Sequence, residues 1–352
     1  MRTVGLLLER LFDMTWLTAA FAVSATSGFV FAAVVLIALL VDHYLGEPPA
    51  RWHPVVWMGN YLNAVAPRVV PASSVSRVPL DTRDLKAFTL GAAYWCAGAA
   101  IVLVVAVTLQ WVILKLPLVL AALLMGLALK PLLAWAMLRR EVHAVERALA
   151  ESLEAGRERL SWLVSRDTSV LSESEVRESA IESLAENLND SVVAPIFWFV
   201  LLGLPGAAIY RFANTADAMW GYRGLRAGVN WEWAGKWAAR VDDVLSWMPA
   251  RITALLLLLV AGGLNVKVLM LEARKTPSPN SGWPMAAMAL ALKVSLRKPG
   301  VYVLNPDGHQ PTAADTISAQ KYALKVVVSA CLCAQAAIIL IALTVMKVAV
   351  AA

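Results

Sequence analysis

Residues 87–114 read AFTLGAAYWCAGAAIVLVVAVTLQWVIL, 28 consecutive positions without a charged side chain. About 20 apolar residues in a helix are enough to cross the hydrocarbon core of a bilayer. Two more uncharged runs reach that length, 14–41 with 28 residues and 326–346 with 21. A water-soluble core does not need such lengths. The sequence therefore predicts an all-α, multi-pass integral membrane protein.

The composition supports this fold class. Hydrophobic residues make up 59% of the 352 positions and charged residues only 16%, whereas a soluble domain carries roughly 25% charged residues. The net charge of +6 follows from basic loops and requires no nucleic-acid partner. The run 14–41 is too long for the apolar core of a cleavable signal peptide, so we expect a retained anchor.

We expect a single membrane-embedded domain over 1–352, in which helical polar segments alternate with apolar ones. The polar segments are 42–86, 139–190, 211–251 and 267–325. Lys and Arg number 8 in 130–190, 6 in 211–251 and 8 in 267–325. Such loops usually face the cytoplasm, which predicts that the last three polar segments lie on the cytoplasmic side of a bacterial inner membrane.

This orientation constrains the apolar segment 191–210. If 191–210 and 252–266 both crossed the bilayer, 211–251 would lie outside. Pro195 and the sequence Gly203-Leu204-Pro205-Gly206 favour a broken, re-entrant segment instead, since irregular backbone is tolerated at membrane depth where it lines a cavity. We therefore expect 191–210 to leave the membrane on the side where it enters.

Two helices are expected in the segment 139–190. The first covers 139–155, with Gly156 as its C-terminal cap. The second follows Arg166-Asp167-Thr168 and begins with a capping box formed by Ser172 and Glu175. Along it, carboxylates recur at spacings of three and four, on one helical face: Glu175, Glu178, Glu182, Glu186 and Asp190.

A solvated acidic stripe is the simpler explanation of these carboxylates. However, like charges at this spacing repel one another, and Asp190 abuts an apolar segment. Mg²⁺ is commonly held by one or two carboxylates together with substrate phosphates, and it would relieve this repulsion. Glu186, Asn187 and Asp190 are therefore candidate functional residues.

Three other groups of polar residues are candidates for ligand or metal binding, and each also has an explanation as an ordinary structural feature. Asn214 and Asp217 share a helical face with Gly221, which would leave room for a ligand; the alternative is a helix cap. Arg240-Val241-Asp242-Asp243 places adjacent carboxylates in a weakly polar segment, where an Arg240–Asp243 ion pair would leave Asp242 unassigned.

The third group is Ser278-Pro279-Asn280-Ser281-Gly282-Trp283-Pro284. It predicts a turn that opens a helix near Pro284, and free N–H groups there, with Lys275 close by, can bind phosphate. An ordinary Pro/Gly/Asn turn is the alternative. No P-loop, dinucleotide fingerprint, His-Glu-x-x-His or Gly-x-Ser-x-Gly motif occurs, so any nucleotide must use a less familiar site.

These groups and others occur in one order along the chain: Gly46-Glu47-Pro48 with His53-Pro54-Val55, Arg166-Asp167-Thr168-Ser169, Glu182 to Asn187, Asn189 to Pro195, Asn214 to Tyr222, Arg240 to Asp243, and Ser278 to Pro284. In this order they resemble the CobD/CbiB family over about residues 36–305. The extension 1–30 lies outside the resemblance. Glu47 stands where Asp is usual, Ser191 replaces a usual Gly, and Met285 replaces a usual Glu, so no catalytic role is carried over to Met285.

The resemblance implies ATP-dependent condensation of adenosylcobyric acid, a corrinoid, with aminopropanol or its phosphate, in vitamin B12 biosynthesis. It implies Mg²⁺ and ATP, with catalytic roles for Glu186, Asp217, Asp242 and Asp243, and metal binding by these four together with Asp190. Substrate and phosphate binding would fall to Arg166, Asn187, Asn214, Arg223, Arg240, Lys275, Ser278, Asn280, Ser281 and Gly282. Two alternatives stay open, a non-catalytic regulator or assembly partner of the same fold (AmpE-like) and a transporter. Association with other cobalamin-assembly membrane proteins, or with a second copy, is also left open.

Overall fold

The computed structural model describes residues 25–70, 83–226, 228–263 and 265–351. The first part of the expected anchor, 14–24, and most of the extension 1–30 lie outside these ranges. Within them the chain is almost entirely α-helical, with two short antiparallel hairpins. Five helical segments are long and apolar enough to cross a membrane, which confirms the predicted fold class.

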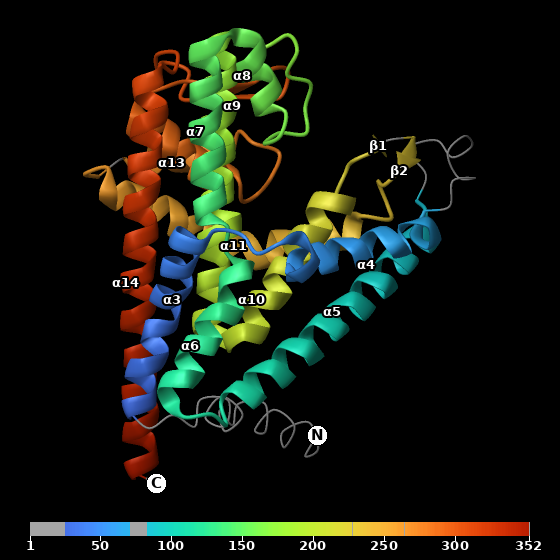
Figure 1. Ribbon diagram of the computed structural model, residues 1–352. Coiled ribbons are helices and arrows are strands. Elements are labelled where there is room, and N and C mark those ends of the chain that lie inside the picture. Colours follow the sequence, from blue (N-terminus) through green and yellow to red (C-terminus); the bar gives the residue numbers. More distant parts are fainter. Residues whose placement is uncertain (1–24, 71–82, 227, 264, 352) are drawn as a thin grey trace.

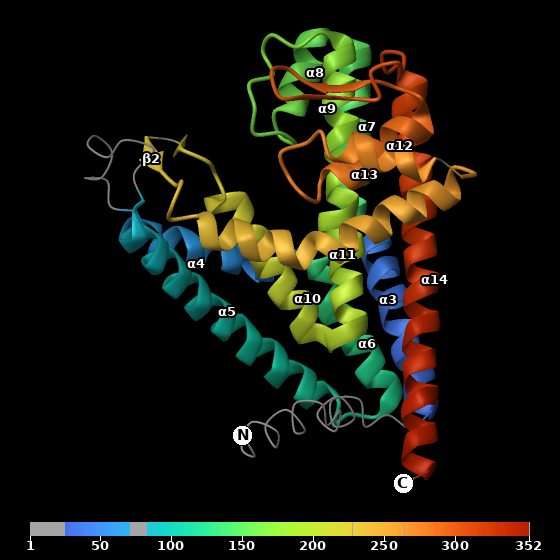
Figure 2. The same cartoon turned by 180° about the vertical axis from the view of Figure 1, so that it is seen from behind.

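The apolar helices form most of the lower part of the molecule (Figure 1). They are α3 (Ala25–Leu45), α5 (Leu85–Ile113), α6 (Leu118–Leu129), α10 (Ala194–Trp220), α11 (Lys236–Val260) and α14 (Ala313–Ala351). α14 runs along the height of the molecule, whereas α11 runs across the direction of α14 (Figures 1 and 2). α11 and α14 are both long and apolar enough to span a membrane, but they are not aligned with each other.

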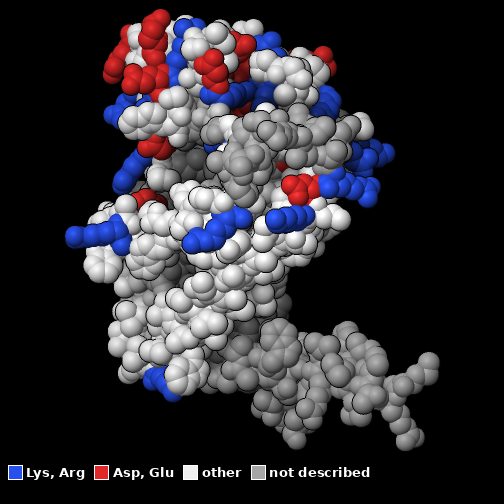
Figure 3. Space-filling view, turned by 90° about the vertical axis from the view of Figure 1, so that its right-hand side faces the viewer, with Lys and Arg blue, Asp and Glu red and all other residues white. Residues whose placement is uncertain are grey.

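The more polar elements lie mainly in the upper part. They are η1 (Ala50–Trp52), α4 (Pro54–Val69), η3 (Lys130–Leu132), α7 (Trp135–Glu151), α8 (Leu153–Leu160), α9 (Glu173–Leu188), the π-helical turn η4 (Asn189–Val193), β1 (Leu225–Arg226), β2 (Val229–Asn230), α12 (Val266–Ala273), α13 (Gly282–Leu292), β3 (Leu296–Lys298) and β4 (Tyr302–Leu304). In Figure 3 the charged side chains gather in this upper part, and the lower part is almost free of them. The molecule therefore divides into a polar head and an apolar membrane body.

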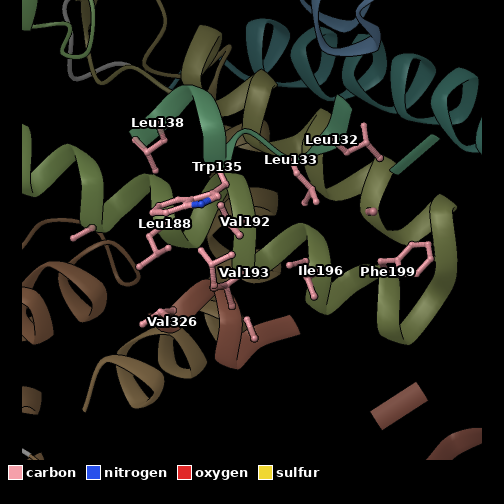
Figure 4. Packing of buried hydrophobic residues seen from close by; sticks show 14 of the residues in the cluster. Leu132, Leu133, Trp135, Leu138, Leu188, Val192, Val193, Ile196, Phe199 and Val326 are labelled. Atoms are coloured by element: carbon pink, nitrogen blue, oxygen red, sulfur yellow. The ribbon is translucent and has the colours of Figure 1, made fainter. Parts of the chain in front are cut away.

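A buried cluster joins the head to the membrane body. Trp135 at the start of α7 lies against Leu188 and Val192, where α9 passes into η4, and Val326 of α14 closes the other side (Figure 4). All four side chains are buried. This packing fixes the end of α9, which carries the candidate acidic residues, relative to the membrane helices.

The two helices expected in 139–190 are present, but the first ends earlier than predicted. α7 ends at Glu151, and Ser152 caps α8 by accepting a hydrogen bond from Ala155 N (3.1 Å). Gly156 lies inside α8, so its prediction as a C-terminal cap was wrong. A Cβ at Gly156 would lie 2.3 Å from Leu149 Cδ2; the glycine instead permits close packing of α7 on α8.

The predicted capping box of α9 is confirmed. Ser172 Oγ accepts a hydrogen bond from Glu175 N (3.4 Å), and Glu175 Oε2 accepts one from Ser172 N (2.8 Å). Both contacts join residues three apart, which is why the sequence alone was sufficient to predict them.

The segment 191–210 is broken as predicted, but at only one of its two predicted positions, and its re-entry into the membrane stays a prediction. Pro195 continues a helix that runs from α9 through η4, because the π-helical turn accommodates the N–H missing from proline. The chain breaks at Gly203, whose φ of 68° and ψ of −157° suit glycine alone. Gln110 Oε1 accepts the Leu204 N–H at 2.8 Å.

The two halves of α10 fold back on each other at this break (Figure 1). Arg211 Nη1 donates to Asp190 O (3.3 Å) and to Ser191 Oγ (3.1 Å). The end of the segment thus returns to the level of its beginning, as predicted. The hairpin brings Asp190 beside the second half of α10.

Candidate functional site

Carboxylates from three stretches of chain converge at the open end of the α10 hairpin. Asn214 Nδ2 donates to Asp190 Oδ2 (3.3 Å), which joins η4 to α10. The charges of Asp217 and Asp242 lie close enough to that of Asp190 to repel it. η4, α10 and α11 therefore bring together the acidic residues that the sequence singled out.

Arg211 lies among these carboxylates and was not predicted from the sequence. Besides its contacts to Asp190 and Ser191, its Nη1 lies 3.4 Å from Asn214 Oδ1. Its Nε is buried without a hydrogen-bond partner among the described residues. An arginine next to an apolar segment marks a functional position in membrane proteins, and this signal was available in the sequence.

Asp242 has one carboxylate oxygen that is not satisfied. Its Oδ1 is buried and has no hydrogen-bond partner within the described ranges, and Ser246 Oγ lies 3.5 Å from Oδ2. No ion pair joins Arg240 to Asp243 among the contacts of these described residues, so that alternative is wrong. A buried carboxylate oxygen without a partner is unfavourable unless a cation or a donor reaches it.

Asn214 lies in the middle of α10, not at its start, so the alternative of a helix cap is also wrong. A Cβ at Gly221 would lie 1.9 Å from Asp217 Oδ1. The space that this glycine leaves is therefore occupied by the Asp217 carboxylate and not by a ligand, contrary to our expectation. Gly221 is needed to let Asp217 lie where it does.

The site fits a cation only in part. Among the residues that the structure describes, no three His, Cys, Asp or Glu side chains gather closely enough to hold a metal ion. Binding by one or two carboxylates, completed by substrate phosphate and water, suits Mg²⁺. Asp242 Oδ1 is a free oxygen of that kind. Asp243 instead faces the charges of Arg240 and Arg223, so metal binding at Asp243 stays a prediction.

A polar pocket of about 180 Å³ lies further along α9. Its walls carry both signs of charge, from Arg166, Glu182, Glu186, Asn187, Lys298 and Tyr302. Arg166 Nη2 donates to Glu182 Oε2 (2.9 Å), while Arg166 Nη1 and Glu182 Oε1 are buried without partners in the described part of the chain. Cations that face carboxylates across a small cavity suit an anionic group that arrives with a metal ion.

Lys298 and Tyr302 of the β3–β4 hairpin were not predicted from the sequence. Burial, together with the charge of Glu182, raises the pKa of Tyr302 above its usual value. A tyrosine hydroxyl is protonated at neutral pH, and that of Tyr302 lies 3.9 Å from Met285 Sδ, so it can donate a hydrogen bond to a group bound in the pocket. No local sequence motif indicates that either residue belongs to the site, because only the tertiary fold brings the β3–β4 hairpin next to α9.

The acidic stripe of α9 divides into two parts. Glu178 is fully buried and pairs with Arg297, whose Nη2 lies 2.9 Å from Oε1. Glu182 pairs with Arg166, so at these two positions a solvated stripe is excluded. Glu186 and Asp190 have no Lys or Arg within ion-pair distance among the described residues, and they face the site. The end of the stripe is thus its unpaired part, and the functional role expected there stays a prediction.

The turn at Ser278 lies between α12 and α13 in the chain, and its hydrogen bonds hold the start of α13 against α11. Ser278 Oγ accepts hydrogen bonds from Asn280 N and Ser281 N, both at 3.2 Å. Asn280 Nδ2 donates to Asp243 O (2.7 Å) and its Oδ1 accepts from Arg251 (2.8 Å). A Cβ at Gly282 would lie 2.1 Å from Ala273 O, and Lys275 pairs with Glu272 (2.6 Å). Phosphate binding by these residues stays a prediction, because the contacts give them a supporting role.

Glu47 and His53, from the first of the family motifs, form an ion-pair network with Lys130. Glu47 Oε2 lies 2.7 Å from Lys130 Nζ and 3.0 Å from His53 Nε2. Burial raises the pKa of Glu47, but the bonds from His53 and Lys130 outweigh it and leave that pKa below its usual value. His53 Nδ1 accepts the Val55 N–H (3.2 Å) and caps α4, which gives this residue a structural role.

The family model described as "CobD/Cbib protein" matches residues 35–346. A "Probable cobalamin biosynthesis protein CobD" of Methanothermobacter thermautotrophicus is 40% identical over 279 residues, which are 77% of this chain and 86% of the relative. A "Cobalamin biosynthesis protein CobD" of Chromobacterium violaceum is 42% identical over 263 residues, 74% and 79% of the two chains. No solved structure gives a significant match. The chain belongs to the CobD/CbiB family.

Proposed function

We propose that the chain acts in cobalamin biosynthesis as an amide synthase, which joins adenosylcobyric acid to aminopropanol or aminopropanol phosphate at the expense of ATP. The observation that carries the proposal is the buried Oδ1 of Asp242, which lies near the charges of Asp190 and Asp217 and has no hydrogen-bond partner among the residues that the structure describes. A regulator or scaffold would gain nothing from such crowding, which is unfavourable until a cation arrives. The names of the relatives support the pathway.

The reaction proceeds in two steps, in each of which a new bond replaces an existing one. A carboxylate oxygen of the corrinoid bonds to the γ-phosphorus of ATP as the bond to ADP breaks, which gives an acyl phosphate. The amine nitrogen then bonds to the acyl carbon, inorganic phosphate leaves with the electron pair of the C–O bond, and the nitrogen loses a proton. The products are the amide, ADP and phosphate.

The side chains of the site divide this work. Arg166, Lys298 and the Tyr302 hydroxyl donate to phosphate oxygens in the pocket and stabilise the charge that develops there. Glu186 lies in the same pocket and accepts the proton of the attacking amine. Mg²⁺ would be held by Asp242 Oδ1 with at most one further carboxylate, from Asp190 or Asp217, and completed by phosphate and water, and it would shield the phosphate charges. The corrinoid is the large substrate and approaches from the polar head.

Synthesis by the purified protein tests the proposal. The protein in detergent receives adenosylcobyric acid, aminopropanol or its phosphate, ATP and Mg²⁺, and cobinamide is measured by liquid chromatography and mass spectrometry. We expect product with the wild type and a loss of at least about 100-fold in rate for Asp242→Asn, the size typical of a lost electrostatic contact to the transition state.

The exposed Asp307→Asn variant is the matched control, since it removes one carboxylate outside the site, and it should keep wild-type activity. Wild-type activity in Asp242→Asn would remove the metal-binding role. A wild type that makes no product with any amine or nucleotide would remove the synthase proposal and favour a regulator.

A further inference from the structure

A second polar pocket lies between α3 and α7, and it shares no lining residue with the pocket beside Glu186. It measures about 350 Å³. Three arginines and two histidines line it: Arg139, Arg140, Arg147, His43 and His143. No acidic side chain lines it, so its chemistry suits an anion.

The basic residues are gathered on one face of α7 and are not neutralised by neighbours. Arg139, His143 and Arg147 follow one another at intervals of four, which places them in line along the helix. In the described ranges none of the three arginines forms an ion pair. The nearby Glu141 pairs with Arg159, and Glu146 with Arg177. A row of like charges is unfavourable by itself, and a bound anion would offset it.

The shape of the pocket is fixed by the junction of α3 and α7. Asp42 at the end of α3 accepts the Ala136 N–H of α7 (2.6 Å). Gly46 adopts a φ of +67°, and a Cβ there would lie 3.0 Å from Arg140 Nη1. The Arg140 guanidinium therefore packs directly over the turn that follows α3. The pocket is held by the fold and does not depend on the placement of a loop.

The surroundings indicate that the anion belongs to a lipid. Leu36, Leu40 and Tyr44 of α3 are exposed by 42%, 46% and 75%. They recur at intervals of four, so they form an apolar stripe along the membrane helix. His43 lies on the same face and its ring contacts that of Tyr44 edge to face, with centroids 4.9 Å apart. The stripe thus leads from the membrane body to the mouth of the basic pocket.

We propose that the α3–α7 pocket binds the phosphate of an anionic phospholipid, whose acyl chains lie along Leu36, Leu40 and Tyr44. Arginine forks match phosphate oxygens in pairs, and basic pockets beside membrane helices suit anionic head groups. A soluble phosphate ester would use the arginines but would leave the apolar stripe uncovered. The lipid would hold α7, and with it the polar head, at a fixed depth.

Native mass spectrometry of the full-length protein in detergent tests this site. Phosphatidylglycerol, phosphatidylcholine and glycerol 3-phosphate are titrated separately. We expect phosphatidylglycerol to bind tightly and the other two weakly. The triple variant Arg139→Gln, Arg140→Gln, Arg147→Gln should lower the affinity for phosphatidylglycerol about 100-fold, since each basic residue near an anionic lipid surface strengthens binding several-fold.

Two further triple variants separate charge from folding. Lys267→Gln, Arg274→Gln, Lys321→Gln removes three exposed charges elsewhere and should bind as the wild type does. Arg139→Lys, Arg140→Lys, Arg147→Lys keeps the charge and should stay within about tenfold of the wild type, because charge supplies most of this attraction. Unchanged phosphatidylglycerol binding in the glutamine variant would overturn the proposal. Equal binding of phosphatidylcholine would do the same, and tighter binding of glycerol 3-phosphate would assign the pocket to a soluble anion.

Discussion

A buried ion-pair network around Lys130 lies at the boundary between the polar head and the membrane body. Lys130 has a side chain only 4% exposed, and its ammonium group lies between Asp42 (3.4 Å) and Glu47 (2.7 Å). A buried charge is tolerated only when its partners stay in place. Asp42 also binds the first turn of α7. This small network therefore positions α7 relative to α3.

Glu47→Gln should destabilise the protein because it leaves Lys130 with one partner in place of two. We expect a loss of about 2 kcal/mol and a melting temperature lower by about 5 °C, measured in detergent at pH 7. Glu47→Asp keeps the charge but shortens the side chain, so its melting temperature should lie between those of the wild type and Glu47→Gln.

The effect of Glu47→Gln should depend on pH. The pKa of Glu47 in the folded protein lies below its usual value, so its contribution is fully present above the usual glutamate pKa of about 4.3. The contribution is lost as the pH falls through the lower, folded pKa. The difference in melting temperature between wild type and Glu47→Gln should therefore shrink below about pH 4. A difference that grows on acidification would contradict this assignment.

At the scale of helices, the sequence was informative wherever the deciding contact is local. The capping box of Ser172 and Glu175 joins residues three apart, and it was predicted correctly. Gly156 was assigned wrongly as a cap because its role depends on Leu149 in the preceding helix. Lys298 and Tyr302 were missed for a similar reason, since their neighbours in the site come from other elements of the fold. Arg211 was missed although its position next to an apolar segment is visible in the sequence.

The α10 hairpin contains one feature that could be predicted from the sequence and two that could not. The Gly-Leu-Pro-Gly sequence at 203–206 predicted the break, because few other residues permit it. The continuity through Pro195 was not predicted, since the π-helical turn that makes it possible has no simple sequence pattern. Nor does any sequence pattern indicate that Gln110, 94 residues away, accepts a hydrogen bond from the Leu204 N–H next to the break.

Gly203→Ala should damage the hairpin and the site that it carries. Alanine strongly disfavours this backbone conformation, and its Cβ would lie 2.4 Å from Gln110 Oε1. The strain alone amounts to about 1–3 kcal/mol. We expect a lower melting temperature together with reduced cobinamide synthesis, because Asp190 and Arg211 meet only when the two halves of α10 fold back.

Gly228→Ala is the matched control for the hairpin variant. Gly228 also has a positive φ, of +75°, but nothing lies within 4 Å of the position of its Cβ. Its replacement should cost only the strain of an exposed turn and should leave synthesis unchanged. Equal losses of activity in the two variants would show that the α10 break has no special role.

At the scale of the whole molecule, the site lies at the boundary between polar head and membrane body. The carboxylates of Asp190, Asp217 and Asp242 are carried by η4, α10 and α11, beneath α9 and α13 (Figure 1). The connection between α5 and α6 lies at the opposite, lower end (Figures 1 and 2). A site at this level would be open to the water-soluble ATP and amine of the proposed reaction, while the apolar helices fix it in place.

This arrangement makes a prediction about the two faces of the membrane. Because the α10 hairpin returns to its starting level, the β1–β2 hairpin and the loop after β4 should lie on one side, and the α5–α6 connection on the other. Single cysteines at Leu225, Asp307 and Lys115 mark these three places, after Cys96, Cys331 and Cys333 have been replaced by alanine. A membrane-impermeant maleimide is then applied to bacterial cells that express each variant.

Leu225→Cys and Asp307→Cys should react only after the inner membrane is permeabilised, because the basic loops around them favour the cytoplasm. Lys115→Cys should react in cells whose inner membrane is intact, once the reagent has passed the outer membrane. Each variant is first checked for cobinamide synthesis, so that only folded protein is compared. Labelling of Leu225→Cys together with Lys115→Cys in intact cells would mean that α10 crosses the bilayer. The carboxylates on η4 and α10 would then be separated by the membrane, and a common site built from them would be excluded.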